Sequence, residues 1–330
     1  MKLGILVVYL AAEEDERLLE IHLSQIEKTT SVPFRIYAAA NRLLPRFREK
    51  IERLSYVSIC QIPTTKLRDS FEHAHYLDRL VEIAVADGAT FICTFHVDSF
   101  PVCAGWLEKI TAEMREDCVL AGVERDERKD RKPVTEFMIF TREFYVAHRP
   151  TFRLTESEMA SSEYPKYLAN CPHTPDSGLG YGFKLWSQGL SWFPLKRLHN
   201  DRAPSTGGLY GDLIFHLGGM VRNRSARKDV TSPKISAAHL LSLFRAFGRA
   251  VVPSKLWRRF NRMNAIQRWA EAHWARPLRG RVFLETGDAV LFRETRDALL
   301  ADPEEFLHRL RDTPRGEAEV SRNSKSGTIT

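Results

Sequence analysis

Residues Phe91–Pro101 read Phe-Ile-Cys-Thr-Phe-His-Val-Asp-Ser-Phe-Pro. An apolar run typical of a buried strand ends in a triplet with two polar side chains, His96-Val97-Asp98, and Pro101 predicts a turn. In an extended triplet His96 and Asp98 point to the same side, because side chains alternate along a strand. Two interpretations remain open: a strand end with two solvated polar residues, or a site at which a carboxylate and an imidazole hold a divalent cation.

The first hundred residues alternate between strands and helices. Predicted strands cover residues 3–10, 33–40, 56–62 and 90–95, and predicted helices cover residues 13–28, 42–54 and 70–86. The strands are short apolar runs, whereas the helices carry apolar residues at helical spacing. This order predicts a mostly parallel α/β sheet flanked by helices, in which ligands bind beyond the carboxyl ends of the strands.

The second part of the chain is less regular. Further helices are predicted at residues 105–115, 142–147 and 183–187, and further strands at residues 118–123, 136–141 and 190–194. We expect a charged loop at residues 126–132 and few regular elements at residues 154–175. The predicted parts of the chain are an α/β domain over residues 1–225, a basic, aromatic helical extension over residues 226–312, and a disordered tail over residues 313–330.

The net charge of +7 is concentrated in one segment. Residues 221–282 hold 15 Lys and Arg but only 2 acidic residues, so the segment carries +13 and the remainder is mildly acidic. Arginines alternate there with Trp and Phe, which suits an anionic membrane surface. The alternative is that the aromatics pack on the preceding domain and the arginines are solvated. Nucleic acid is the least favoured partner, because no zinc, RNP or helix-turn-helix signature supports it.

The bulk composition sets further limits. With 330 residues the chain has room for one large α/β domain and an appendage. No run approaches the roughly 18 apolar residues that a membrane-spanning helix needs. The five cysteines are an odd number without CxxC spacing, which favours reduced thiols in a cytoplasmic protein over a disulfide framework or a zinc site.

Polar residues also stand at other predicted strand and helix ends. Tyr9 and Ala11 lie at the turn after the first strand, and Asn41 ends the second strand, where an amide can hydrogen-bond a base or a ribose. His73 and His75 open the helix before the key strand, an end that suits a phosphate. Each has a plainer interpretation as an ordinary turn, a helix cap or a solvated first turn.

Two candidates lie downstream. Asp176, in the loop Pro175-Asp-Ser-Gly, is placed to act as a catalytic base or simply to cap the next helix. His216, in Ile-Phe-His-Leu-Gly-Gly, is either a core histidine or a metal ligand beside Asp98.

In this order the pattern resembles the GT-A glycosyltransferases, especially the family-2-like inverting enzymes. The stretch Phe95–Pro101 takes the place of their D-x-D motif after strand four, with His96 in place of the first acid. Pro175–Gly178 resembles the acidic segment that carries the base, and His216 stands where the late metal ligand is expected. The resemblance covers roughly residues 3–220.

The resemblance implies a metal-dependent transferase whose catalytic domain is residues 1–225. Asp98 and His216 are implied to bind Mn²⁺ or Mg²⁺, and Asp176 is implied to take the proton of the acceptor hydroxyl, with inversion at the anomeric carbon. The residues implied to contact the nucleotide-diphosphate sugar are Tyr9, Ala11, Asn41, His73, His75 and His96.

The expected partners are a nucleotide-sugar and a glycan or lipid-linked acceptor, met in the cytoplasm or at the inner face of the membrane during synthesis of a surface glycan. A sugar nucleotidyltransferase is disfavoured because no glycine-rich loop follows the first strand, and the same absence weakens dehydrogenase and P-loop interpretations. A glycosyltransferase-like domain that binds without turnover stays open, because His96 departs from the motif.

Overall fold

The computed structural model describes residues 1–11, 15–67, 70–114, 117–125, 130–171, 177–198, 207–218 and 288–312. Asp176, most of the predicted basic extension and the predicted tail lie outside these ranges. Contacts along the chain divide it into one unit of Met1–Gly218 with Thr295–Thr330, and a second unit of Gly219–Glu294. The following description concerns the first unit.

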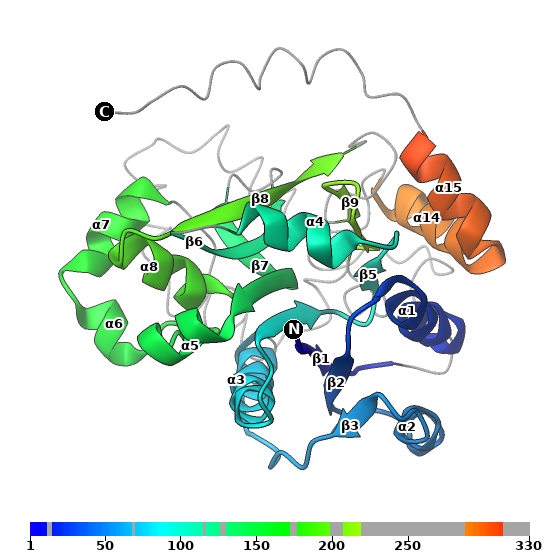
Figure 1. Cartoon of the computed structure of the whole chain (residues 1–330), viewed down its shortest axis with the longest axis horizontal. Coiled ribbons are helices and arrows are strands. Elements are labelled where there is room, and N and C mark those ends of the chain that lie inside the picture. The colour runs from blue at the N-terminus through cyan, green and yellow to red at the C-terminus, as the bar shows by residue number, and fades with distance from the viewer. Residues whose placement is uncertain are drawn as a thin grey trace, which may run out of the picture. The chain divides into compact units, whose positions relative to one another are not determined.

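Four parallel strands form the first half of the sheet. They are β1 (Leu3–Val8), β2 (Phe34–Ala39), β3 (Val57–Ile59) and β4 (Phe91–Phe95), arranged in the order β3-β2-β1-β4. The connecting helices are α1 (Glu16–Thr29), α2 (Pro45–Glu52) and α3 (Ser70–Ala86). Figure 1 shows α3 on one face of these strands and α1 and α2 on the other. The carboxyl ends of all four strands therefore meet at one edge, as predicted.

Helix α3 packs closely on β1 because residue 4 is a glycine. A Cβ atom at Gly4 would lie 3.0 Å from the Cβ of Ala89 and 3.2 Å from the Cβ of Ala84. Leu77 and Leu80 on α3 are almost completely buried, which confirms the apolar face predicted from helical spacing. This packing fixes the position of α3 beside β4, and hence the position of His73 near its amino end.

The second half of the sheet is mixed. Its strands are β5 (Ser99–Pro101), β6 (Cys118–Arg125), β7 (Asp130–Thr141), β8 (Ser191–Leu198), β9 (Gly208–Tyr210) and β10 (Ile214–His216). Strand β7 runs antiparallel to β4 and β6, β8 is parallel to β6, and β9, β10 and β5 continue with antiparallel pairs. The predicted class, an α/β sheet flanked by helices, is confirmed, and parallel pairing predominates only in its first half.

Three local predictions were wrong. Residues 130–132 of the charged loop expected at residues 126–132 belong instead to β7, which begins at Asp130 and pairs with β6, and residues 126–129 lie outside the described residues. Residues 154–175 contain α6 (Glu156–Ala160) and α7 (Glu163–Asn170), and α6 starts with a capping box between Thr155 and Glu158. Pro101 does not make a turn but ends β5, the last strand in the sheet order, where a proline is tolerated.

The remaining helices are α4 (Trp106–Glu113), α5 (Arg142–His148), α8 (Leu179–Ser187), α14 (Asp288–Ala301) and α15 (Pro303–Asp312). Helix α15 belongs to the first unit, on which it packs through Phe306, whose ring centroid is 5.6 Å from that of Phe215. Its Glu304 pairs with Lys28 of α1 at 2.8 Å. From the sequence we expected this helix to be part of the basic extension over residues 226–312.

All five cysteines lie among the described residues and are free thiols, with Cys60 and Cys93 buried. In the part of the chain that the structure describes, no helix combines the length and the apolar character needed to cross a membrane.

Candidate functional site

The stretch after β4 is a turn rather than an extended strand. The backbone N–H of Ser99 donates to the carbonyl oxygen of His96 at 3.0 Å, and Ser99 Oγ accepts from the backbone N–H of His96 at 2.8 Å. The same hydroxyl donates to the carbonyl oxygen of Glu136 on β7 at 2.6 Å. The prediction from strand alternation was therefore wrong in its mechanism. His96 and Asp98 do approach each other, but they do so because Ser99 closes a tight turn between them.

Strand β10 brings His216 to this turn. His216 pairs with Ser99 of β5 on one side and with Gly208 of β9 on the other. The N–H of the following residue, Leu217, donates to the carbonyl oxygen of Asp98 at 2.9 Å. The backbone at residue 207 comes so close to Leu217 that this position requires glycine, because a Cβ atom there would lie 2.5 Å from the carbonyl oxygen of Leu217. Two segments more than a hundred residues apart are thus held together by backbone hydrogen bonds.

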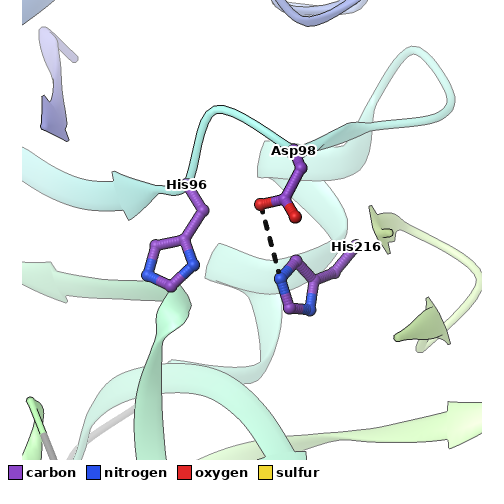
Figure 2. Close-up of side chains that lie close together, drawn as sticks. All are labelled: His96, Asp98 and His216. Atoms are coloured by element: carbon purple, nitrogen blue, oxygen red, sulfur yellow. Dashed lines mark ion pairs between the residues drawn. The ribbon is translucent and has the colours of Figure 1, made fainter. Parts of the chain in front are cut away.

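His96, Asp98 and His216 form one cluster of potential metal ligands. Each residue offers one ligand atom, and these atoms all lie within 4.8 Å of one another. Asp98 Oδ1 is 3.5 Å from His216 Nε2, and the rings of His96 and His216 have centroids 5.7 Å apart. Figure 2 shows the three side chains pointing toward a common centre, with one ring nitrogen of His96 facing the other two residues. Asp98 and His216 are each only 4% exposed.

His216 is the most informative member of the cluster. Among the described residues, neither of its two buried ring nitrogens has a hydrogen-bond partner. A buried polar group without a partner is costly, and native proteins rarely contain one unless a ligand or a water satisfies it. Two imidazoles and a carboxylate are donors that divalent transition-metal ions accept. The residues present therefore fit the cation that the sequence resemblance implies.

A chain of polar side chains extends from His96. His96 Nε2 lies 3.3 Å from Thr135 Oγ1, Thr135 Oγ1 lies 2.8 Å from Ser177 Oγ, and Ser177 Oγ lies 3.3 Å from His73 Nδ1. The rings of His73 and His96 also meet edge to face, with centroids 5.0 Å apart. Burial, with the nearby His96, lowers the pKa of His73 to about 3, so His73 is neutral at physiological pH.

A buried ion pair lies next to the cluster. Arg125 of β6 and Glu136 of β7 approach to 2.6 Å, with side chains 2% and 8% exposed. Burial alone would raise the pKa of Glu136, but Arg125 and the two histidines His96 and His216 lower it below its ordinary value. Glu136 is therefore a carboxylate, paired with the Arg125 guanidinium beside the proposed ligands.

The predicted residues at the ends of β1 and β2 lie differently from expectation. Tyr9 is buried, and its hydroxyl lies 3.4 Å from Nε2 of His22, whose Nδ1–H donates to the carbonyl oxygen of Ser99 at 2.9 Å. Burial lowers the pKa of His22 to about 4, so this ring is neutral. Tyr9 thus contacts the turn that carries Asp98 only indirectly, through the ring of His22. Ala11 is buried as well, and the Asn41 amide donates to the carbonyl oxygen of Ile62 at 2.9 Å.

The two histidines of α3 face in different directions. Residues two apart on a helix are about 200° apart around its axis, so His75 turns away when His73 faces the cluster. The ring of His75 lies instead against Tyr76, with centroids 5.6 Å apart. Asp176 lies outside the described residues, but its neighbour Ser177 belongs to the polar chain described above.

Six residues described at the site were not among the sequence candidates: His22, Ser99, Arg125, Thr135, Glu136 and Ser177. Thr135 and Glu136 interrupt the apolar stretch from Pro133 to Phe140 within β7, and polar residues inside such a stretch were a usable signal. His22 falls on the buried face of α1, where a polar residue was a comparable sign. Ser177 carried no such signal.

No protein-family profile matches the sequence, and no curated protein is significantly similar to it. Among solved structures, parts of the chain align with the mannosyltransferase PcManGT from Pyrobaculum calidifontis in complex with GDP-Man and Mn²⁺ (12% identity, 44% of this chain and 46% of that one, TM-score 0.32). They also align with S. aureus TarS in complex with UDP-GlcNAc (14% identity, 49% and 51%, TM-score 0.35).

A third similar structure is a mutant of Drosophila beta-1,4-galactosyltransferase 7 in complex with manganese, UDP-Gal and xylobiose (14% identity, 72% and 78%, TM-score 0.34). The alignments span about half the length of the first two proteins. Similarity at these scores says nothing of substrate or mechanism, which have to follow from the side chains of the site.

Proposed function

We propose that this chain is a metal-dependent GT-A-type glycosyltransferase that moves a sugar from a nucleoside-diphosphate donor to an acceptor hydroxyl. The observation that carries the proposal is the convergence of His96, Asp98 and His216 at the carboxyl end of β4, with both nitrogens of His216 buried and without a hydrogen bond. In an open α/β sheet, this edge is where nucleotides bind. The sequence order of the candidate residues, which resembles that of the GT-A enzymes, supports the same conclusion.

In this proposal Asp98 and His216 would hold the cation at the donor diphosphate. When bound, the cation supplies positive charge where negative charge develops as the sugar leaves. The acceptor oxygen forms a bond to the anomeric carbon while the bond from that carbon to the diphosphate oxygen breaks. The hydroxyl proton passes to a carboxylate, for which we propose Asp176, and attack from the face opposite the diphosphate inverts the anomeric centre.

The position of Ser177 supports this role for Asp176. Ser177 is the next residue in the chain, and its Oγ is hydrogen-bonded to Thr135, which in turn contacts His96. The residue next to the proposed base in the chain, Ser177, therefore lies at the edge of the metal cluster.

We propose a glycan or a lipid-linked sugar as the acceptor, since the basic and aromatic segment 221–282 suits an anionic or lipid surface. The free thiols of all five cysteines support a reducing compartment, hence the cytoplasm.

Thermal-shift measurements test the proposal directly. UDP and GDP are each added with and without Mn²⁺, and at least one is expected to raise the melting temperature more in the presence of the ion. Asp98→Ala is expected to abolish this metal-dependent shift. The matched control is Asp117→Ala. Asp117 is exposed and lies just before the start of β6, whereas Arg125, which lies next to the metal cluster, is at the other end of that strand. No shift with any nucleoside diphosphate would count against the function.

Turnover is a separate measurement. Release of the nucleoside diphosphate from UDP- or GDP-sugars is expected to be lost in Asp176→Asn while the metal-dependent thermal shift is kept, because the base is needed for chemistry and not for donor binding. Donor binding without any release by the native chain would instead indicate a glycosyltransferase-like binding domain.

A further inference from the structure

His96 is the residue at which this chain departs from the D-x-D pattern, and its surroundings give it a definite orientation. Its Nε2 lies 3.3 Å from Thr135 Oγ1. Because Nε2 contacts Thr135, the nitrogen that faces Asp98 and His216 in Figure 2 is Nδ1. A ring held in this way presents one chosen nitrogen to the cluster, as outer hydrogen bonds do for metal-bound histidines.

The polar chain beyond His96 has a consistent direction when Nδ1 is a ligand. A ligating Nδ1 carries no proton, so the proton is on Nε2, which then donates to Thr135 Oγ1. With the proton on Nε2, the Thr135 hydroxyl is left to donate to Ser177 Oγ, 2.8 Å away, and the Ser177 hydroxyl to donate to His73 Nδ1, 3.3 Å away. In this direction the Thr135 hydroxyl accepts from His96 and donates to Ser177, and the Ser177 hydroxyl accepts from Thr135 and donates to His73. A protonated Nδ1 would leave Nε2 as an acceptor and reverse the chain.

We propose that His96 is the third metal ligand, through Nδ1, and that the resulting set of two imidazoles and one carboxylate selects Mn²⁺ and its transition-metal neighbours against Mg²⁺. Mg²⁺ prefers oxygen ligands and is usually held by carboxylates, phosphates and water. Imidazole favours the transition metals, whose affinity for nitrogen ligands rises along the series from Mn²⁺. The inference rests on the metal site of the proposed function and adds to it the identity of the ion and the role of Thr135 as a positioning residue.

The test is direct metal binding by the metal-stripped 330-residue chain, without nucleotide. Mn²⁺ is titrated in and free Mn²⁺ is followed by its electron paramagnetic resonance signal, alone and in competition with Mg²⁺. We expect His96→Asp, which substitutes an oxygen ligand, to lower the ratio of Mn²⁺ affinity to Mg²⁺ affinity by about tenfold or more, because it exchanges one of two imidazoles for a harder donor. The control, His308→Asp, changes an exposed histidine on α15 and is expected to leave the ratio unchanged.

Thr135→Val removes the hydroxyl and keeps the side-chain shape. We expect it to weaken Mn²⁺ binding by about 10–100-fold, as loss of an outer-shell partner does, while Thr111→Val on α4 has no such effect. Urea unfolding of the metal-free proteins separates this result from general damage: a positioning role predicts weaker Mn²⁺ binding even in a variant that keeps its midpoint.

The outcomes separate this inference from the proposed function. An unchanged ratio in His96→Asp, or no Mn²⁺ binding by the native protein at millimolar concentrations, would overturn the inference. A metal-dependent response to UDP or GDP would still support the function in the first case. The predicted ratio, together with no binding of any nucleoside diphosphate, would support the ion selectivity and overturn the transferase assignment.

Discussion

Ser99→Ala removes the hydroxyl that closes the turn between His96 and Asp98. Ser99 is fully buried, and its Oγ accepts the backbone N–H of His96 at 2.8 Å and donates to the carbonyl oxygen of Glu136 at 2.6 Å. Alanine leaves both backbone groups without this partner. A buried polar group that loses its hydrogen bond costs about 1–3 kcal/mol, and partial access of water at His96 favours the lower part of that range, so we expect a loss of about 2–4 kcal/mol in the free energy of unfolding.

Urea unfolding followed by circular dichroism measures this loss, and the Mn²⁺ titration described above measures its effect on the site. We expect Mn²⁺ affinity to fall as well, since the turn that presents Asp98 is no longer tied to β7. Ser191→Ala is the control, because Ser191 is exposed at the start of β8 and its loss is expected to stay within about 0.5 kcal/mol. If Ser99→Ala matched this control in both stability and Mn²⁺ affinity, the Ser99 hydroxyl would not be what holds the turn in place.

Three further perturbations follow from the structure. Burial raises the pKa of Asp78 from its ordinary value of about 3.9 to about 7. The folded protein therefore binds this proton more tightly than the unfolded chain does. The resulting stabilisation is complete below about pH 3.9 and is lost as the pH rises through about 7. Asp78→Asn keeps an acceptor for the Phe152 N–H but does not titrate. We expect the free energy of unfolding of the native protein to fall by a few kcal/mol between about pH 5 and about pH 8 because of Asp78, and this fall to be absent in the variant. Parallel plots of unfolding free energy against pH for the two proteins would refute this prediction. Glu136→Gln leaves Arg125 without its buried counter-charge and is expected to cost about 3–5 kcal/mol in urea unfolding, whereas a loss below about 1 kcal/mol would show that the pair is not a stabilising element. Gly180→Ala places a Cβ against two backbone carbonyl oxygens and is expected to lower stability by about 3 kcal/mol, which a native-like midpoint would contradict.

The first half of the sheet could be predicted from the sequence because its signals are local. Short apolar runs alternate with helices whose apolar faces recur at helical spacing, and this pattern specifies parallel strands joined by crossover helices. The second half could not be predicted in the same way, since the antiparallel partners of β7, β9 and β10 are set by tertiary packing and not by any local pattern.

The candidate site shows the same division. Asp98 and His216 could be singled out by residue type and by position after apolar runs, but their meeting depends on the pairing of His216 with Ser99, across more than a hundred residues. The sequence suggested an extended triplet at His96, whereas a serine side chain makes it a turn, because hydroxyls bond to nearby backbone groups in ways that strand periodicity does not include. Tyr9 was chosen as a ligand contact at the mouth of the sheet but is buried against His22.

We propose that His96, Asp98 and His216 bind a divalent cation which holds a nucleoside diphosphate. Crystals grown with Mn²⁺ and UDP or GDP test it through anomalous diffraction near the manganese absorption edge. We expect one strong anomalous peak within bonding distance of Asp98, His216 Nε2 and His96 Nδ1, with diphosphate oxygens also bound to the ion. Ordered nucleotide with no anomalous peak among these three side chains, or a manganese peak elsewhere in the chain, would contradict it.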